Sequence, residues 1–227
     1  LPATTLTERC YDNMFYGCTA LVNVPATLGT SVGNFCCASM FYGCTSLTAA
    51  PALPATTLAT SCYVTMFRDC TSLVTAPALP ATTLATSCYN GMFRGCTALT
   101  TAPVLPATAL ESSCYNGMFY GCTALVTAPA LPATTLATQC YQSMFRECTS
   151  LVTAPALPAT SLVSYCYRYM FRDCTLLNYI ECMAIENINT NSCDTWLSGV
   201  AAAGTFKRNI ASTTGTGGWT LDSTSGI

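Results

Sequence analysis

The sequence predicts an α/β repeat protein, a right-handed solenoid of seven 26-residue units that each contribute one short parallel strand and one short helix. Three observations support this prediction: a Met-Phe pair recurs at a fixed interval, apolar residues within each unit are spaced by four, and a short β-prone run closed by proline follows them. A fixed period of about 20–50 residues is typical of a solenoid, in which each unit buries its apolar side against its neighbours. The repeating methionines are Met14, Met40, Met66, Met92, Met118, Met144 and Met170.

The unit at residues 79–104, which reads LPATTLATSCYNGMFRGCTALTTAPV, illustrates the predicted helix. Its apolar stripe consists of Leu84, Cys88, Met92 and Cys96. A spacing of four is close to the helical period of about 3.6 residues. A proline precedes the stripe, threonines can cap it, and a glycine ends it in several units. We therefore expect one short helix in each unit.

The run that follows the stripe predicts a short strand, at residues 99–102 of the same unit. Pro103 closes the run, and proline cannot donate a hydrogen bond to a strand ladder. Stacked in register, these runs would form a parallel ladder with one short strand per unit. The expected shape is an arc with strands on the inside and helices on the outside.

The period decays past Cys182. The chain therefore divides into a seven-repeat solenoid at residues 1–182 and a degenerate eighth repeat with a C-terminal cap at residues 183–227, since solenoid ends must cover an otherwise open core. Trp196 and Leu197 take the Met-Phe place in this last unit, and short edge strands are expected around residues 205–207 and 219–221. The chain opens inside the repeat consensus, which suggests a fragment or processed form without a visible targeting segment.

Composition argues against several classes of function. Only 8% of the residues are charged and the net charge is −2, which leaves no basic surface for nucleic acid. No apolar run approaches the roughly 18 residues of a membrane span, so we expect no membrane insertion. Histidine is absent, which excludes Ser-His-Asp and Cys-His catalytic arrangements and His-ligated zinc within this chain. We predict neither enzymatic activity nor a cofactor.

Fourteen of the seventeen cysteines form two columns at the repeat period, from Cys10 to Cys166 and from Cys18 to Cys174. A disulfide framework, a metal array and buried free thiols are the alternatives. Disulfides require Cα atoms about 4.4–6.8 Å apart, whereas the expected helices would separate the two cysteines of one unit by about 12 Å and neighbouring units by about 8–10 Å. A metal array would lack histidine and close cysteine pairs. We favour buried free thiols, with Cys182 and Cys193 as a candidate disulfide pair.

The string MFxxCTxL, which follows LPATTLxxxCY and precedes a short run closed by Ala-Pro, resembles the BspA-like, Treponema-type family of bacterial leucine-rich repeats. The resemblance covers residues 1–182 and more loosely the tail. It implies a right-handed leucine-rich-repeat solenoid and an extracellular or bacterial cell-surface location, in a family with several adhesins for host matrix proteins or other cells. It brings no catalytic residues. The unit here is longer than the usual one, and Ala102-Pro103 stands where the family more often has Ile or Leu.

Comparison of the units singles out one variable column. The Leu, Met, Phe and Cys columns hardly vary, as expected of a core. The residue after each Phe is instead either Tyr or Arg, two residue types enriched at binding hot spots. We call this column the outer ridge and take it as the candidate ligand contact. Its members are Tyr16, Tyr42, Arg68, Arg94, Tyr120, Arg146 and Arg172. The alternative is that these are ordinary solvated positions whose stems cover apolar surface.

Three functions remain open. A surface module that binds a host or matrix protein or a glycan is favoured by the resemblance and by the extended surface of a repeat scaffold. A structural spacer or filament component is the alternative, and end-to-end self-association is a further expectation because the first unit has no visible cap.

An ice- or crystal-surface binder is suggested by the threonine column Thr75, Thr101, Thr127 and Thr153, although Asn23 and Ala49 interrupt it and no second column is evident. Glycan binding would also predict a common groove for the aromatic cluster of Tyr165, Tyr167, Tyr169 and Tyr179.

Overall fold

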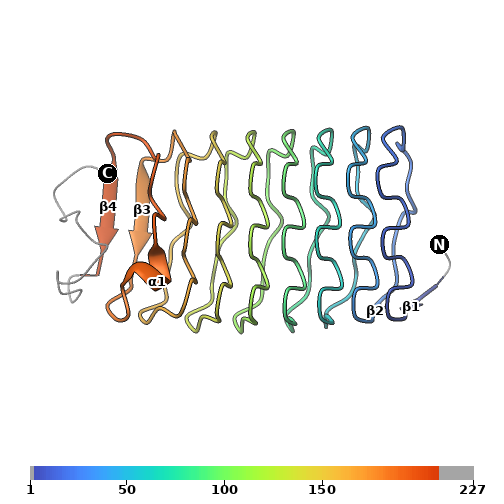
Figure 1. The fold of residues 1–227 in the computed structure, drawn as a ribbon, viewed down its shortest axis with the longest axis horizontal. Helices are drawn as coiled ribbons and strands as arrows, with labels where there is room; N and C mark the ends of the chain where they lie inside the picture. Colours follow the sequence, from blue (N-terminus) through green and yellow to red (C-terminus); the bar gives the residue numbers. More distant parts are fainter. Residues whose placement is uncertain (1–2, 210–227) are drawn as a thin grey trace.

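The structure is a computed structural model, and it describes residues 3–209. It is a solenoid whose coils stand side by side along one axis, from the first coil to strand β4 (Figure 1). The stack is nearly straight in this view rather than the arc that the sequence predicted. The handedness, the count of seven units and the domain division at residue 182 stay predictions.

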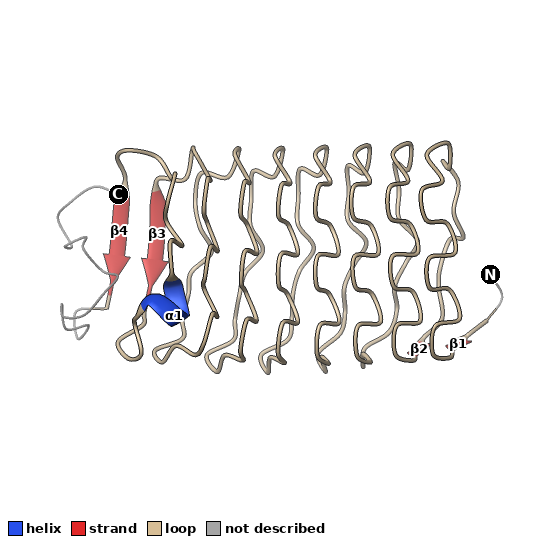
Figure 2. Cartoon of the chain, viewed as in Figure 1, coloured by secondary structure: helices blue, strands red, loops and turns tan. Residues whose placement is uncertain are grey.

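Regular secondary structure is sparse in this part of the chain. The strands are β1 at Thr5–Leu6, β2 at Ser31–Val32, β3 at Tyr179–Cys182 and β4 at Thr205–Arg208, and the helix α1 spans Thr190–Cys193. Strand β1 pairs in parallel with β2, and β3 pairs in parallel with β4. Figure 2 shows that turns and loops make up the rest of the coils. Strand β4 confirms the edge strand expected around residues 205–207, while residues 219–221 lie outside the described residues.

The predicted strand of each unit is reduced to a single parallel bridge. These bridges link Ala49 to Thr75, Thr75 to Thr101, Thr101 to Thr127, Thr127 to Thr153 and Thr153 to Tyr179. They confirm the predicted position and parallel register, because residue 101 lies within the run 99–102. Each run stays short because a proline such as Pro103 follows at once. A second line of bridges joins Thr57 to Thr83, Ala109 to Thr135 and Ser161 to Glu186.

The prediction of one helix per unit was wrong. Residues 85–96 instead form a chain of overlapping turns, in which every second amide donates to the carbonyl three residues before it. Met92 N, for example, donates to Tyr89 O at 3.2 Å, whereas the next amide, Phe93 N, donates to Met118 O in the following coil at 2.9 Å. A helix would direct every amide to a carbonyl four residues back in its own segment. Here half of the amides bind the neighbouring coil.

A left-handed backbone at every fourth residue produces the spacing that suggested a helix. In this coil Ser87, Gly91 and Gly95 have φ values of 57°, 61° and 74°. Each occupies the third position of a turn, where a type II turn requires a positive φ. An inward-facing pair therefore repeats every four residues, as in Cys88-Tyr89 and Met92-Phe93, all of which are buried.

Columns of stacked side chains form the core. The Phe rings of successive coils, from Phe15 to Phe171, lie 5.5–5.7 Å apart between centroids and are almost parallel. The Tyr rings from Tyr63 to Tyr167 stack at 5.8–6.3 Å. Both columns end at Trp196, against which Phe206 of β4 packs edge-on at 6.1 Å. Strand β4 therefore adds the buried side chain of Phe206 to the last described layer of the core.

Within residues 3–209, no helix has the length and apolarity needed to cross a bilayer.

Candidate ligand-binding ridge

The chain of turns places the outer ridge on the surface. Because inward and outward pairs alternate, the residue after each buried Phe turns outward, and Arg94 after Phe93 is half-buried. Consecutive ridge members lie on neighbouring coils, and several of them touch one another. Tyr16 and Tyr42, for example, stack with centroids 4.7 Å apart. The structure therefore places the sequence-predicted residues in one row along the stack and joins them in two groups, Tyr16–Tyr42–Arg68 and Arg94–Tyr120–Arg146.

Arginine–tyrosine contacts hold much of the row in place. The guanidinium carbons of Arg94 and Arg146 lie 4.2 and 5.0 Å from the ring centroid of Tyr120. Since the coil of Tyr120 stands between theirs, the ring is sandwiched between two cations. Arg68 lies 5.2 Å from the ring of Tyr42 in the same way. Such contacts contribute about 0.5–1 kcal/mol each at exposed sites.

Carboxylates pair with three of the four ridge arginines. The Nε atoms of Arg68, Arg146 and Arg172 lie 3.3–3.4 Å from carboxylate oxygens of the residues that follow them, Asp69, Glu147 and Asp173. Surface ion pairs of this kind contribute little to stability, but they restrict where each guanidinium points. The hydroxyl of Tyr120 also donates to Glu147 at 3.1 Å.

Arg94 differs from the other ridge arginines because Gly95 follows it. It is the one ridge arginine for which residues 3–209 provide no carboxylate within 4.0 Å. No carboxylate of the described chain binds its outward N–H groups, so these groups can donate to an acceptor on a ligand.

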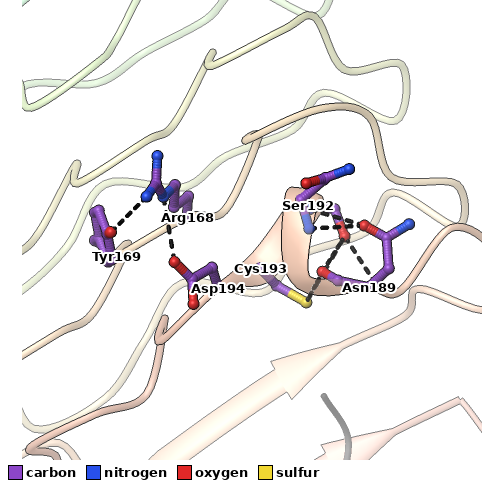
Figure 3. Close-up of polar contacts among 7 residues, drawn as sticks. Arg168, Tyr169, Asn189, Ser192, Cys193 and Asp194 are labelled. Carbon is purple, nitrogen blue, oxygen red and sulfur yellow. Dashed lines mark hydrogen bonds and ion pairs between the residues drawn. The ribbon is translucent and has the colours of Figure 1, made fainter. Parts of the chain in front are cut away.

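The C-terminal end of the ridge carries a denser cluster around Tyr169. The sequence did not predict this cluster as part of the ridge. The guanidinium carbons of Arg168, Arg172 and Arg146 lie 4.5, 5.5 and 6.0 Å from the Tyr169 ring centroid. Arg168 Nη2 donates to the Tyr169 hydroxyl at 2.6 Å, and Arg168 Nε lies 3.4 Å from Asp194 Oδ2 (Figure 3).

The tyrosine cluster predicted at the C-terminal end does not line one groove. Tyr167 is buried in the core column, 6.1 Å from Trp196. Tyr165 lies near Arg168, whose guanidinium carbon is 5.2 Å from its ring, and Tyr179 belongs to strand β3. Tyr165 and Tyr169 therefore lie on one surface, on which Arg168 contacts both rings, whereas Tyr167 points into the core and Tyr179 belongs to strand β3.

The cysteines are buried from Cys36 onward, whereas Cys10 and Cys18 in the first coil are exposed. The thiols of the second column bind the preceding coil, as when Cys96 Sγ donates to Phe67 O at 3.0 Å. Burial raises the pKa of the Cys44 thiol to about 11 and that of Cys70 to about 12. The helical distances used above do not apply, because bridged coils lie about 4.8 Å apart.

All seventeen cysteines are free in the structure, including Cys182 and Cys193. Cys193 Sγ lies 3.4 Å from Asn189 O, to which it donates, instead of bonding Cys182. In the described part of the chain, no three Cys, Asp or Glu side chains are grouped so that they could hold a metal ion.

An uncharged apolar surface lies outside the sites that the sequence predicted. A hollow of about 460 Å³ lies between two coils and is lined by Pro80, Pro103 and Val104 among others, with Val104 77% exposed. A smaller hollow of about 210 Å³ repeats the arrangement at Leu131, Pro132 and Pro158. The recurring APxLP string is the signal that could have located it, because it combines apolar residues with prolines that cannot pair in a ladder.

The threonine column is in register at Thr75, Thr101 and Thr127, and the structure adds a second exposed line at Thr57 and Thr83. Ala109 interrupts this second line, as Ala49 interrupts the first.

Comparison with known proteins identifies the repeat. A family model described as a BspA type leucine rich repeat region matches residues 4–117 and 112–196, in 6 copies. Neither the curated proteins nor the solved structures contain a match to the chain.

Proposed function

The chain belongs to the BspA-type leucine-rich-repeat family, and from this premise we propose that it is a non-enzymatic binding protein that holds a protein or glycan ligand on its outer ridge. The proposal places it outside the cell or on a bacterial cell surface, where it mediates adhesion. The stacked tyrosine–arginine row is the observation that carries the proposal.

The ridge concentrates the positive charge of a chain in which only 8% of the residues are charged. Five of the eight lysines and arginines lie on it or beside it, namely Arg68, Arg94, Arg146, Arg168 and Arg172. Their stacking and ion pairs order them before any ligand arrives. The entropy of these side chains is therefore already reduced before binding, and a ligand that contacts them gains affinity.

The geometry also defines what a ligand would contact. Both faces of the Tyr120 ring are covered by arginines, so the ligand meets ring edges, tyrosine hydroxyls and outward guanidinium N–H groups. These groups favour a ligand rich in oxygen acceptors, such as carbonyls, carboxylates or sugar hydroxyls. Because the contacts repeat from coil to coil, a long ligand would engage several at once and gain avidity.

The decisive experiment is an array of glycans and extracellular-matrix proteins, probed with the chain and with a variant carrying Arg94→Ala, Tyr120→Ala and Arg146→Ala. The matched control carries Val74→Ala, Val126→Ala and Val152→Ala, three exposed positions outside the ridge. Binding that the ridge variant loses and the valine variant keeps supports the proposal. Binding lost only in the valine variant would assign recognition to the surface that carries these valines instead.

A conservative substitution separates stacking from charge. Arg94→Lys keeps the positive charge but loses the planar group that stacks on Tyr120. We expect it to weaken binding nearly as much as Arg94→Ala.

A structural spacer is the second candidate, and the nearly straight stack together with the internal pairing of most ridge arginines favours it. If the folded chain bound nothing on the whole array, the result would favour the spacer over the binding module.

A further inference from the structure

The surface is hollowed where the eighth repeat departs from the consensus. Three asparagines occur at alternate positions there, Asn187, Asn189 and Asn191, in place of the small residues of the regular unit. The hollow has a volume of about 330 Å³. Its lining comes from three segments of the chain: Thr138, then Leu162, Val163 and Ser164, then Asn187, Asn189, Asn191 and Ser192.

Internal hydrogen bonds fix one wall of the hollow. Asn189 Oδ1 accepts from the backbone amides of Asn191 and Ser192 at 2.9 and 3.2 Å. The Ser192 hydroxyl lies 2.7 Å from Asn187 O and donates to it. Asn187 Nδ2 donates to the Ser161 hydroxyl at 3.1 Å. The backbone that carries the asparagines is therefore held in position before a ligand binds.

Several polar groups of the lining have no hydrogen-bond partner within residues 3–209. They are Nδ2 of Asn189, Oδ1 of Asn187, the side-chain amide of Asn191, and the hydroxyls of Ser164 and Thr138. Amides and hydroxyls both donate and accept hydrogen bonds. None of the lining residues carries a charge. The buried side chain of Leu162 and the half-buried side chain of Val163 add an apolar portion.

We propose that this hollow binds an uncharged saccharide unit. A sugar ring presents closely spaced hydroxyls that donate and accept, which matches the free amides and hydroxyls, and its C–H face matches the half-buried side chain of Val163. The volume falls within the range of about 300–1,000 Å³ that is usual for small-molecule sites. Anionic sugars gain no partner here because the lining offers no cation. The hollow contains no outer-ridge residue, so this proposal goes beyond the function proposed above and stands independently of it.

The test is ligand-observed saturation-transfer NMR on the full chain, with the methyl glycosides of glucose, galactose, mannose and N-acetylglucosamine as probes. Glucuronic acid is the charged comparator, and N-acetylglycine amide tests whether any amide-bearing molecule suffices. We expect millimolar binding of at least one neutral glycoside and weaker binding of both comparators. A folded chain that shows no transfer to any neutral glycoside would overturn the proposal.

Variants locate the binding. Ser164→Ala and Asn191→Ala each remove a free polar group without breaking a side-chain hydrogen bond in the described structure, and we expect each to weaken binding about 5–10-fold. Ser112→Ala is the matched control, since Ser112 holds the same repeat position as Ser164 two units earlier. Circular dichroism confirms that each variant is folded.

The ridge variant Arg94→Ala, Tyr120→Ala, Arg146→Ala separates the two sites. Saccharide binding that survives in the ridge variant and falls in Ser164→Ala and Asn191→Ala supports the hollow. The reverse pattern would assign the saccharide to the ridge and overturn this proposal while leaving the proposed function standing.

Discussion

The first coil and the interior coils share one consensus but differ in burial. Met14 is 48% exposed, whereas Met40, at the same position one coil later, is fully buried. Cys10 and Cys18 are exposed, and their counterparts Cys36 and Cys44 are buried. The interior coils have a neighbour on each side, while the first described coil has one. Burial in this protein is therefore a property of the interface between coils rather than of a unit.

Thiol reactivity should show the largest difference between the two regions. Thiol reagents attack the thiolate, so an accessible cysteine reacts far faster than a buried one of raised pKa. We expect Cys10 and Cys18 to react at once with a maleimide and the other fifteen only after unfolding, at rates lower by at least about a thousandfold. Mass spectrometry of the labelled peptides counts the fast sites. Rapid labelling of Cys96 or Cys122 would contradict the buried columns.

The buried thiols also make stability depend on pH. In the unfolded chain a cysteine ionises near its ordinary pKa of about 8.5, whereas burial raises the pKa of Cys44 to about 11 and that of Cys88 to about 12. The folded state therefore holds its protons more tightly. This contribution to the free energy of unfolding is complete below about pH 8.5 and is lost as the pH rises through 11–12. Denaturation curves measured from pH 7 to pH 11 under reducing conditions should show a steadily falling midpoint, and a flat profile would argue against buried thiols.

Truncating the methionine tests the comparison at one side chain. Met118→Ala removes a fully buried side chain and should cost about 2–5 kcal/mol. Met14→Ala in the first coil should cost less than about 1 kcal/mol, because that side chain is half exposed already. Guanidinium denaturation followed by circular dichroism measures both. Equal losses would mean that the first coil is covered in solution, as end-to-end association would do.

The smallest expected difference concerns the left-handed glycines. Gly117 and Gly17 have φ values of 59° and 71°, and an added Cβ would meet no atom within 4 Å at either position. Alanine there would thus be penalised by backbone conformation alone. Gly117→Ala should destabilise the chain by about 1 kcal/mol, and Gly17→Ala by less because an end coil can open locally. Thermal unfolding of the pair measures this, and an unchanged midpoint for Gly117→Ala would speak against the chain of turns.

The sequence allowed the solenoid, the buried columns and the place of the parallel bridges to be predicted, because each follows from the period. It did not reveal the turns. Leu84, Cys88, Met92 and Cys96 fit both a helix and a turn of four residues. The unchanging step of four, without the steps of three that a helix also uses, favoured the turn. The deciding fact is that Phe93 N bonds to Met118 O, and such a contact 25 residues away leaves no local signature.

The sequence predicted which residues lie on the outer ridge but not the contacts that they make with one another. Variation among units located Arg94 and Tyr120 on one surface, whereas their stacking depends on the spacing between coils, which periodicity alone does not supply. The hollow beside Asn187 and Asn189 escaped notice for a related reason, since it is formed by three segments that only folding brings together.

The turns align peptide dipoles along the axis of the stack. Their inter-coil bonds all run one way, as from Tyr63 N to Cys88 O and from Tyr89 N to Cys114 O, so these peptide dipoles point along the axis and add. The bridged surfaces run in both directions, with Leu58 N donating forward and Thr82 N donating backward, and largely cancel. On the surface formed by the turns, the backbone carbonyls of the first described coil point away from the stack and carry partial negative charge. A cation, or a positively charged surface, is therefore the partner that the backbone of that coil favours.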